Sequence, residues 1–240
     1  MDKLITIYHG SEEIVEQPTF GEGKKNNDFG LGFYCTPNEE LAKEWAVSSL
    51  HDGFSNRYTL DTEYLNILNL NCPDYTILNW IAVLVEHRIF SIHTPVARRA
   101  KRYLIDNFSI NVNAFDMIIG YRADDSYFDY AEGFLNNAIS VEQLALAMRL
   151  GKLGEQIVIK SKYAFSNLKY EGSDVAEKDQ YYVLRKTRDD GANQHYLRIL
   201  EEESDGLYIQ DIMRGGMKND DPRIPRNISE QSAVGAWQRL

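Results

Sequence analysis

Short strand-like segments and longer helical segments alternate along this chain, and this alternation restricts the fold more than any other feature of the 240 residues. Compact apolar runs at residues 4–8, 115–120 and 155–160 are typical of buried strands. Apolar residues at helical spacing predict helices over residues 76–90 and 95–108. Because strands and helices are mixed in this way, we predict an α+β fold.

The remaining segments extend the same pattern. Residues 57–70 predict one or two strands, and residues 124–138 and 140–151 predict helices. The sequence has no internal repeat and no linker long enough to force a second folded domain. We therefore expect one domain at residues 1–177 and a helical and irregular C-terminal extension at residues 178–240.

The extension differs in composition from the rest of the chain. It begins as a charged stretch that predicts a helix as far as Glu203, interrupted at Gly191. A tail rich in Gly, Pro and Arg follows. We expect this tail to contribute little to the core and to lie as an appendage on the domain.

Composition and charge exclude several classes of function. With 43% hydrophobic and 12% aromatic residues, the chain can bury a substantial core. Its net charge of −10 disfavours non-specific binding to nucleic acid or anionic lipid. One basic cluster lies at helical spacing and is best explained as a solvated helix face; it consists of Arg98, Arg99, Lys101 and Arg102.

The sequence also bears on location. The amino terminus is neither a signal peptide nor a membrane anchor, and the longest apolar stretch, residues 80–85, is far shorter than the about 20 residues that span a bilayer. Cys35 and Cys72 are too few for a disulfide framework. We therefore expect a cytoplasmic protein with no membrane partner.

Most standard site motifs are missing. The segments GEGKKN and GLGFYC lack the third glycine of a dinucleotide fingerprint, and there is no phosphate-binding loop and no nucleophile elbow. The five histidines lack the spacing of a metal site, and the carboxylates lack the order of a calcium loop. We therefore predict no metal.

Two strand ends remain as candidates for a binding site. His9-Gly10 ends the first strand, where an imidazole and an unshielded backbone could contact a planar ligand. Gly30 and Gly32 precede the aromatic pair Phe33-Tyr34, which could belong to the core. Taken separately, each feature is also typical of an ordinary turn or a buried aromatic cluster.

Together these segments resemble a known binding half-site. The segments YHGS (8–11) and GLGFYCT (30–36), followed by Trp45 on the next predicted helix, resemble the nicotinamide-binding half of ADP-ribosyltransferases of the diphtheria-toxin and poly-ADP-ribose-polymerase type. The resemblance implies an ADP-ribosyltransferase-like split β core with flanking helices. It also implies that Tyr34 and Trp45 cover the two faces of the nicotinamide ring. The implied polar contacts are His9 with a ribose hydroxyl, Gly10 with the carboxamide through its backbone, and Ser11 with an added hydrogen bond.

A second resemblance covers more of the chain. With the segments FDMIIG and LGEQIVIKSKYAFSNLKY and the order of elements, residues 5–170 are similar to the bacterial family known as domain of unknown function 3990, which is grouped with the ADP-ribosyltransferases. This implies NAD as a co-substrate, mono-ADP-ribosylation of a protein or nucleic-acid acceptor, and a toxin of a toxin–antitoxin or phage-defence pair, with an antitoxin as partner. A catalytically silent NAD or ADP-ribose binding module and a structural interaction protein are the alternatives.

The catalytic carboxylate of the superfamily is the weakest point of the resemblance. At the matching strand, GEQIVIK, the motif position falls on the neutral Gln156. Glu155 is adjacent, but successive side chains of a strand point to opposite faces, so only one of the two faces the cleft. The resemblance favours Gln156, whereas charge alone favours Glu155. Asp124 and Asp125 are expected to cap a helix rather than to activate an acceptor.

Overall fold

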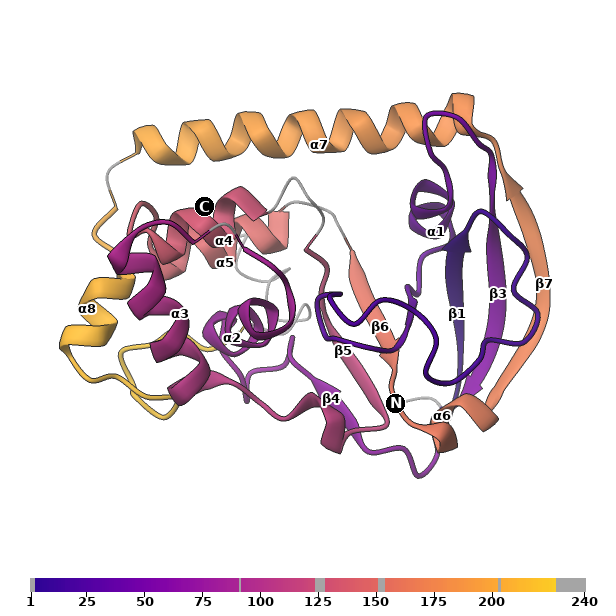
Figure 1. The fold of residues 1–240 in the computed structure, drawn as a ribbon, viewed down its shortest axis with the longest axis horizontal. Coiled ribbons are helices and arrows are strands. Elements are labelled where there is room, and N and C mark those ends of the chain that lie inside the picture. Colours follow the sequence, from indigo (N-terminus) through magenta and orange to yellow (C-terminus); the bar gives the residue numbers. More distant parts are fainter. Residues whose placement is uncertain (1–2, 91, 124–127, 151–153, 203, 228–240) are drawn as a thin grey trace, which may run out of the picture.

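The fold is an α+β arrangement of two sheets and flanking helices, as predicted (Figure 1). The computed structural model describes residues 3–227 except 91, 124–127, 151–153 and 203. The expected cap at Asp124 and Asp125 lies outside the described residues. In the described part of the chain, one sheet has the order β1-β3-β7 and the other the order β2-β6-β5-β4. Their bounds are β1 Leu4–Ser11, β2 Phe33–Cys35, β3 Gly53–Asp61, β4 Ile67–Asn69, β5 Met117–Tyr121, β6 Glu155–Ile159 and β7 Leu168–Ala176.

Strand register brings the two predicted strand ends together. β1 pairs antiparallel with β3, and β2 pairs antiparallel with β6, where Tyr34 lies opposite Val158. The two sheets are joined by a bridge in which the backbones of Tyr8 and Thr36 exchange hydrogen bonds of 2.8 and 2.9 Å. Because this bridge lies next to His9 and two residues after Tyr34, it holds those two residues side by side.

Helices cover both sheets, and their ends follow local capping. α1 (Glu39–Ala46) begins at Asn38, whose side chain accepts a hydrogen bond from Leu41 N at 3.2 Å, as the sequence predicted. α3 (Pro95–Phe108) begins at the cap Thr94 with proline in its first turn. The other helices are α2 Ile77–His87, η1 Val112–Ala114, α4 Phe128–Leu135, α5 Val141–Leu150, α6 Lys162–Ser166, α7 Lys178–Glu201 and α8 Ile209–Arg214.

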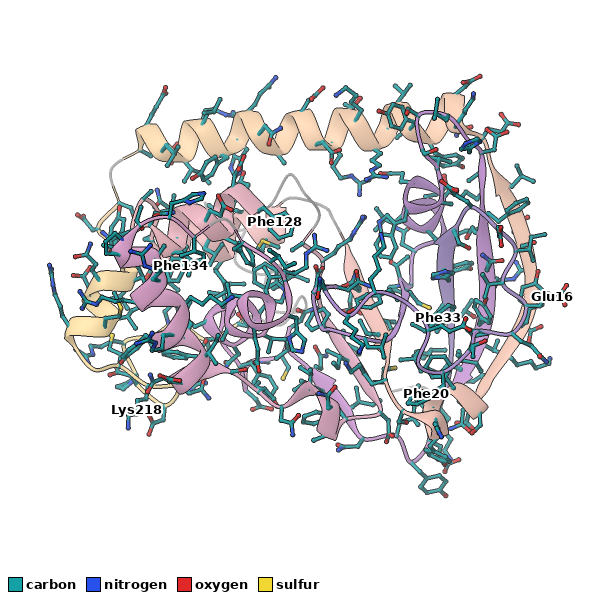
Figure 2. The ribbon with its side chains drawn as sticks, in the orientation of Figure 1. Glu16, Phe20, Phe33, Phe128, Phe134 and Lys218 are labelled. Atoms are coloured by element: carbon teal, nitrogen blue, oxygen red, sulfur yellow. The ribbon has the colours of Figure 1, made fainter. Side chains whose placement is uncertain are left out.

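The buried side chains form one large and two smaller clusters. The large cluster surrounds α2, whose residues 77–85 are all buried, and it includes Phe134. A second cluster lies between the two sheets, where Phe33 packs edge-on against Tyr58 and Cys35 is fully buried. Figure 2 shows Phe33 on the side of the sheets and Phe134 among the helices. No helix of the described residues is long and apolar enough to cross a membrane.

Helix α7 differs from its prediction, because it continues without interruption through Gly191. A glycine within a helix costs only about 1 kcal/mol relative to alanine, so packing elsewhere along α7 can outweigh it. α7 contacts α1 near its beginning and α4 further on, and it buries Tyr181, Ala192 and Ile199. In Figure 1, α7 runs across the whole upper side of the molecule.

The expectation that the tail contributes little to the core is wrong. Ile209, Ile212, Met217 and Ile224 are each at most 4% exposed and belong to the large cluster around α2. Polar contacts bind the same segment to earlier helices, including Tyr103 Oη to the Met217 carbonyl at 2.8 Å. The sequence did not reveal this role because single apolar residues between glycines and charges show no periodicity.

Candidate functional site

A cavity of about 350 Å³ opens where β1, β2, α1 and β6 meet. Its wall includes five of the residues selected from the sequence, namely His9, Gly10, Tyr34, Trp45 and Gln156. These residues come from four elements, of which β1 and β6 are far apart in sequence. The fold therefore brings them to one place, whereas Ser11 and Glu155 do not line the cavity.

His9 is held by the strand that carries Tyr34. Its Nδ1 lies 2.7 Å from the Tyr34 carbonyl oxygen, and its ring packs on Phe33 with the ring centres 4.4 Å apart. Because a carbonyl oxygen only accepts, Nδ1 carries the proton, and the neutral ring leaves Nε2 as an acceptor. Burial lowers the pKa of His9, which the bond to Tyr34 partly opposes. The ring is therefore neutral at pH 7.

The two glycines before Tyr34 allow a tight turn that this tyrosine closes. Gly30 has φ of +73°, a conformation that favours glycine, and a Cβ there would lie 2.5 Å from the His87 ring. Tyr34 Oη donates to the Gly30 carbonyl at 2.5 Å and accepts from Phe29 N at 3.1 Å. Burial raises the pKa of Tyr34 well above its ordinary value. Because the hydroxyl is engaged in the turn, the ring of Tyr34 is the part that it can offer a ligand.

Lys160 stabilises the same turn through hydrogen bonds to its backbone. Its Nζ donates to the carbonyls of Phe29 and Leu31 at 2.8 and 2.7 Å. Burial lowers the pKa of Lys160 to about 8. A neutral amine still has two N–H donors, so both bonds can survive loss of the proton. The position of the turn, and with it Tyr34, is therefore set before any ligand arrives.

Gly10 has a structural reason to be glycine. A Cβ at this position would lie 2.0 Å from the Ala42 carbonyl oxygen in α1. No side chain fits there, so α1 can approach β1 only over a glycine. This close packing carries Trp45 to the cavity wall.

Trp45 contacts a cation from the residue that directly follows β5. The guanidinium carbon of Arg122 lies 4.4 Å from the centre of the indole, which is a cation–π contact. The indole Nε1 is buried and has no hydrogen-bond partner among the described residues. One indole face is thus occupied by Arg122, and its N–H donor is left for a ligand.

Gln156 and Glu155 point to opposite sides of β6, as strand geometry requires. Gln156 lines the cavity, is 5% exposed, and its Oε1 lacks a partner among the described residues. Glu155 accepts a hydrogen bond from Asn71 Nδ2 at 3.1 Å. The neutral amide, rather than the carboxylate, therefore belongs to the cavity.

Ser11 belongs to a different network. Its Oγ donates to the Glu13 carbonyl at 2.7 Å and accepts from Asn56 Nδ2 at 2.9 Å. Asn56 Nδ2 also donates to the His9 carbonyl at 3.2 Å. Ser11 thus helps to hold the chain beyond β1, and the structure does not place it with the other candidates.

The cavity also contains charged residues that sequence reasoning missed. They are Lys24, Asp28, Arg88, Arg122 and Arg185. Asp28 is buried and accepts a hydrogen bond from Ala123 N at 2.9 Å, with Arg88 Nε 3.6 Å away. Arg122 could have been identified from the sequence as a candidate site residue, because it directly follows a buried strand and loops at strand ends often carry site residues. Arg185 lies within a helix, and nothing in the sequence around it indicates a site residue.

Comparison with known proteins identifies a family for this chain. A family model described as "Protein of unknown function (DUF3990)" matches residues 5–170. No curated protein matches the chain, and no solved structure does. All the cavity residues discussed above except Arg185 lie within the matched range. Because the match covers well over half of the sequence, this protein belongs to the DUF3990 family.

Proposed function

We propose that this protein is an NAD-dependent mono-ADP-ribosyltransferase that modifies a protein or nucleic-acid acceptor. The observation that carries the proposal is the gathering of His9, Tyr34, Trp45 and Gln156 around one cavity. An aromatic ring, a neutral imidazole and a buried amide together suit a ligand with a flat ring and a sugar. A volume of about 350 Å³ falls within the range of small-molecule sites.

The reaction would be a displacement at the ribose carbon that carries nicotinamide. The carbon–nitrogen bond breaks and nicotinamide leaves with the electron pair, while the acceptor nucleophile bonds to that carbon and loses a proton. Positive charge develops on the sugar, as in glycoside cleavage. In this site the Tyr34 ring would stack on nicotinamide, and His9 Nε2 and Gln156 Oε1 would accept hydrogen bonds from ribose hydroxyls.

The charges in the site favour slow transfer of a single ADP-ribose unit. Gln156 orients a hydroxyl but carries no negative charge to stabilise the sugar cation. Asp28, the acidic residue among the described lining residues, is buried beside Arg88 and bonded to the Ala123 amide. We therefore propose modest turnover that ends after one ADP-ribose unit. A toxin in a toxin–antitoxin or phage-defence pair, inhibited by an antitoxin, is a biological setting that tolerates slow chemistry.

The second candidate is a binding module without catalysis. Its support is the same Gln156, together with the outward position of Glu155 against Asn71. Such a module would bind NAD or ADP-ribose in the cavity and leave the glycosidic bond intact.

One incubation separates these functions. The purified protein is mixed with NAD labelled in its adenosine half, in the presence of a cell extract that supplies acceptors. Transfer of label to a macromolecule is the expected result, and Tyr34→Ala should abolish it by removing the stacking ring. Tyr34→Phe keeps the ring and is the matched control, which should retain most NAD binding. Bound but intact NAD would favour the silent module, and no NAD binding at millimolar concentration would refute both.

A further inference from the structure

The cavity is locally basic although the protein is acidic. The chain carries a net charge of −10, yet the described lining residues include four cationic side chains and one carboxylate, Asp28. The cations are Lys24, Arg88, Arg122 and Arg185. A concave site of one sign concentrates the electrostatic potential and attracts ligands of the opposite sign. The cavity thus favours an anion.

Arg185 is the unexpected member of this group, since it comes from α7. This helix begins at Lys178, beyond the residues matched by the family model. Within the described residues, the remaining cavity wall comes from segments before Ile159. The C-terminal extension therefore contributes a charged group to a site that is otherwise built by the family domain.

A buried carboxylate holds this part of α7 in place. Glu44 of α1 is 6% exposed, and its Oε1 lies 2.6 Å from Arg188 Nη2. One turn earlier on α7, Arg185 Nη1 donates to the Val47 carbonyl at 3.4 Å. Tyr181 adds a hydrogen bond of 3.0 Å to Glu40. Three contacts along one face of α7 thus orient Arg185 toward the cavity.

The same carboxylate lies within the field of the cavity arginines. Burial raises the pKa of Glu44. Nearby Arg188, Arg122 and Arg185 oppose that rise, whereas the carboxylate of Asp189 adds to it. Arg122 and Arg185 both line the cavity, and Arg122 stacks on Trp45 there.

Two buried atoms in the wall add to the case for a polar ligand. Trp45 Nε1 is a donor and Gln156 Oε1 an acceptor, and neither has a partner among the described residues. Gln156 is 95% buried, so leaving its oxygen unpaired is unfavourable. A ligand that carries hydroxyl groups beside an anion would satisfy both atoms.

We propose that α7 is part of the binding site and that Arg185, with Arg122, binds the diphosphate of a dinucleotide or of ADP-ribose. The identity of the ligand rests on the proposed function, whereas its negative charge rests on the cavity itself. Arginine suits this role because its planar guanidinium forms paired hydrogen bonds with phosphate oxygens. Under this proposal the chain needs its extension for substrate recognition as well as for folding.

The test compares two neighbouring positions on α7. Arg185→Gln removes the charge but keeps a long side chain and an N–H donor for Val47. Lys186→Gln removes one charge from the adjacent residue, whose side chain is 64% exposed and pairs with Asp190 on α7. The affinities for ADP-ribose, inorganic pyrophosphate and nicotinamide are measured by calorimetry, and thermal unfolding confirms that both variants fold.

Arg185→Gln should weaken ADP-ribose and pyrophosphate binding by about tenfold to a hundredfold, because a hydrogen bond to a charged group is lost. Nicotinamide affinity should stay the same, and Lys186→Gln should bind all three like the native protein. The fall of ADP-ribose affinity with added salt should also be less steep in Arg185→Gln. Equal effects of the two substitutions, or none, would overturn the proposal.

These outcomes are separable from those of the proposed function. NAD cleavage that is insensitive to Arg185→Gln would refute the role of α7 and leave the transferase intact. Binding of pyrophosphate and ADP-ribose that depends on Arg185, without nicotinamide binding or NAD cleavage, would support the role of α7 and refute the transferase.

Discussion

At the scale of single residues, Gln156 is the residue on which the proposed function depends most. It occupies the inward position of β6, where its Oε1 has no hydrogen-bond partner among the residues that the structure describes, and the neighbouring carboxylate Glu155 turns away toward Asn71. An amide has nearly the shape of a carboxylate, but it carries no full charge and presents an NH2 donor in place of one acceptor oxygen. Under the proposed function, the protein would therefore bind its substrate well and stabilise the transition state poorly.

Under the proposed function, a carboxylate at position 156 should raise the rate of NAD cleavage. Gln156→Glu should increase NAD cleavage by about one to two powers of ten, because a carboxylate stabilises the developing sugar cation. Burial raises the pKa of a carboxyl, so the gain should grow as pH increases. Gln156→Ala should lower turnover while NAD affinity stays largely the same, because the Tyr34 stack remains. The measurement is the rate of nicotinamide release by the three proteins.

Glu155→Ala is the control for this series. It keeps the cavity wall intact and removes the carboxylate that contacts Asn71. Turnover should not respond to it. If activity disappeared in Glu155→Ala alone, with no response at Gln156, then Glu155 would be the catalytic acid and β6 would shift its register or twist on substrate binding.

At the scale of elements, the contact between β1 and α1 positions half of the site. Gly10 in β1 lies directly under the backbone of Ala42 in α1, and Trp45 follows one turn later. A His-Gly strand end suggested a backbone contact to a ligand, whereas the structure supplies a packing reason for the same glycine. The packing role and the ligand contact are compatible, because packing involves the side of Gly10 where a Cβ would lie and the ligand contact would involve its backbone N–H and C=O groups.

Two glycine substitutions test this packing. Gly10→Ala should destabilise the fold by about 1–3 kcal/mol, because its Cβ would meet a backbone oxygen that cannot move without displacing α1. Gly191→Ala in α7 has nothing within 4 Å of the added carbon and should stabilise the protein by about 0.5–1 kcal/mol. Urea unfolding measures both. A Gly10→Ala protein as stable as the native one would show that this glycine does not position α1.

At the scale of the whole molecule, the extension ties the sheets to the helices. α7 binds α1 through Glu44 and Arg188, and further along its Ala192 carbonyl accepts from Tyr130 Oη of α4 at 2.9 Å. The tail then returns to α2, where Asn79 Nδ2 donates to Asn219 Oδ1 at 2.8 Å. Figure 1 shows α7 crossing from the β1-β3-β7 sheet to the helical side.

The tail should therefore be required for stability. Ile212 is fully buried, so Ile212→Ala should lower the free energy of unfolding by about 2–5 kcal/mol. Leu200→Ala, at a side chain that is 43% exposed on α7, is the matched control and should change it by about 0.5 kcal/mol or less. Denaturant unfolding distinguishes the two. A stable Ile212→Ala protein would restore the view of the tail as an appendage.

The sequence by itself determined the features that depend on near neighbours. The Asn38 cap, the whole of α3 and the strands β5 and β6 follow from hydrogen bonds and periodicities that span a few residues. It also indicated His9, Tyr34, Trp45 and Gln156, since a motif is a local pattern that a resemblance can recognise.

Only the tertiary structure decided which charges surround these residues and where the extension lies. Arg122, which follows β5, contacts Trp45 of α1. Arg185 lines the cavity because the next turn of α7 is held by the ion pair between Arg188 and Glu44, which lies 144 residues earlier in the chain. Gly191 fails to break α7 and the apolar residues of the tail enter the core for the same reason. Contacts between distant segments form only when the chain packs, and their energies exceed the local preferences that a sequence displays.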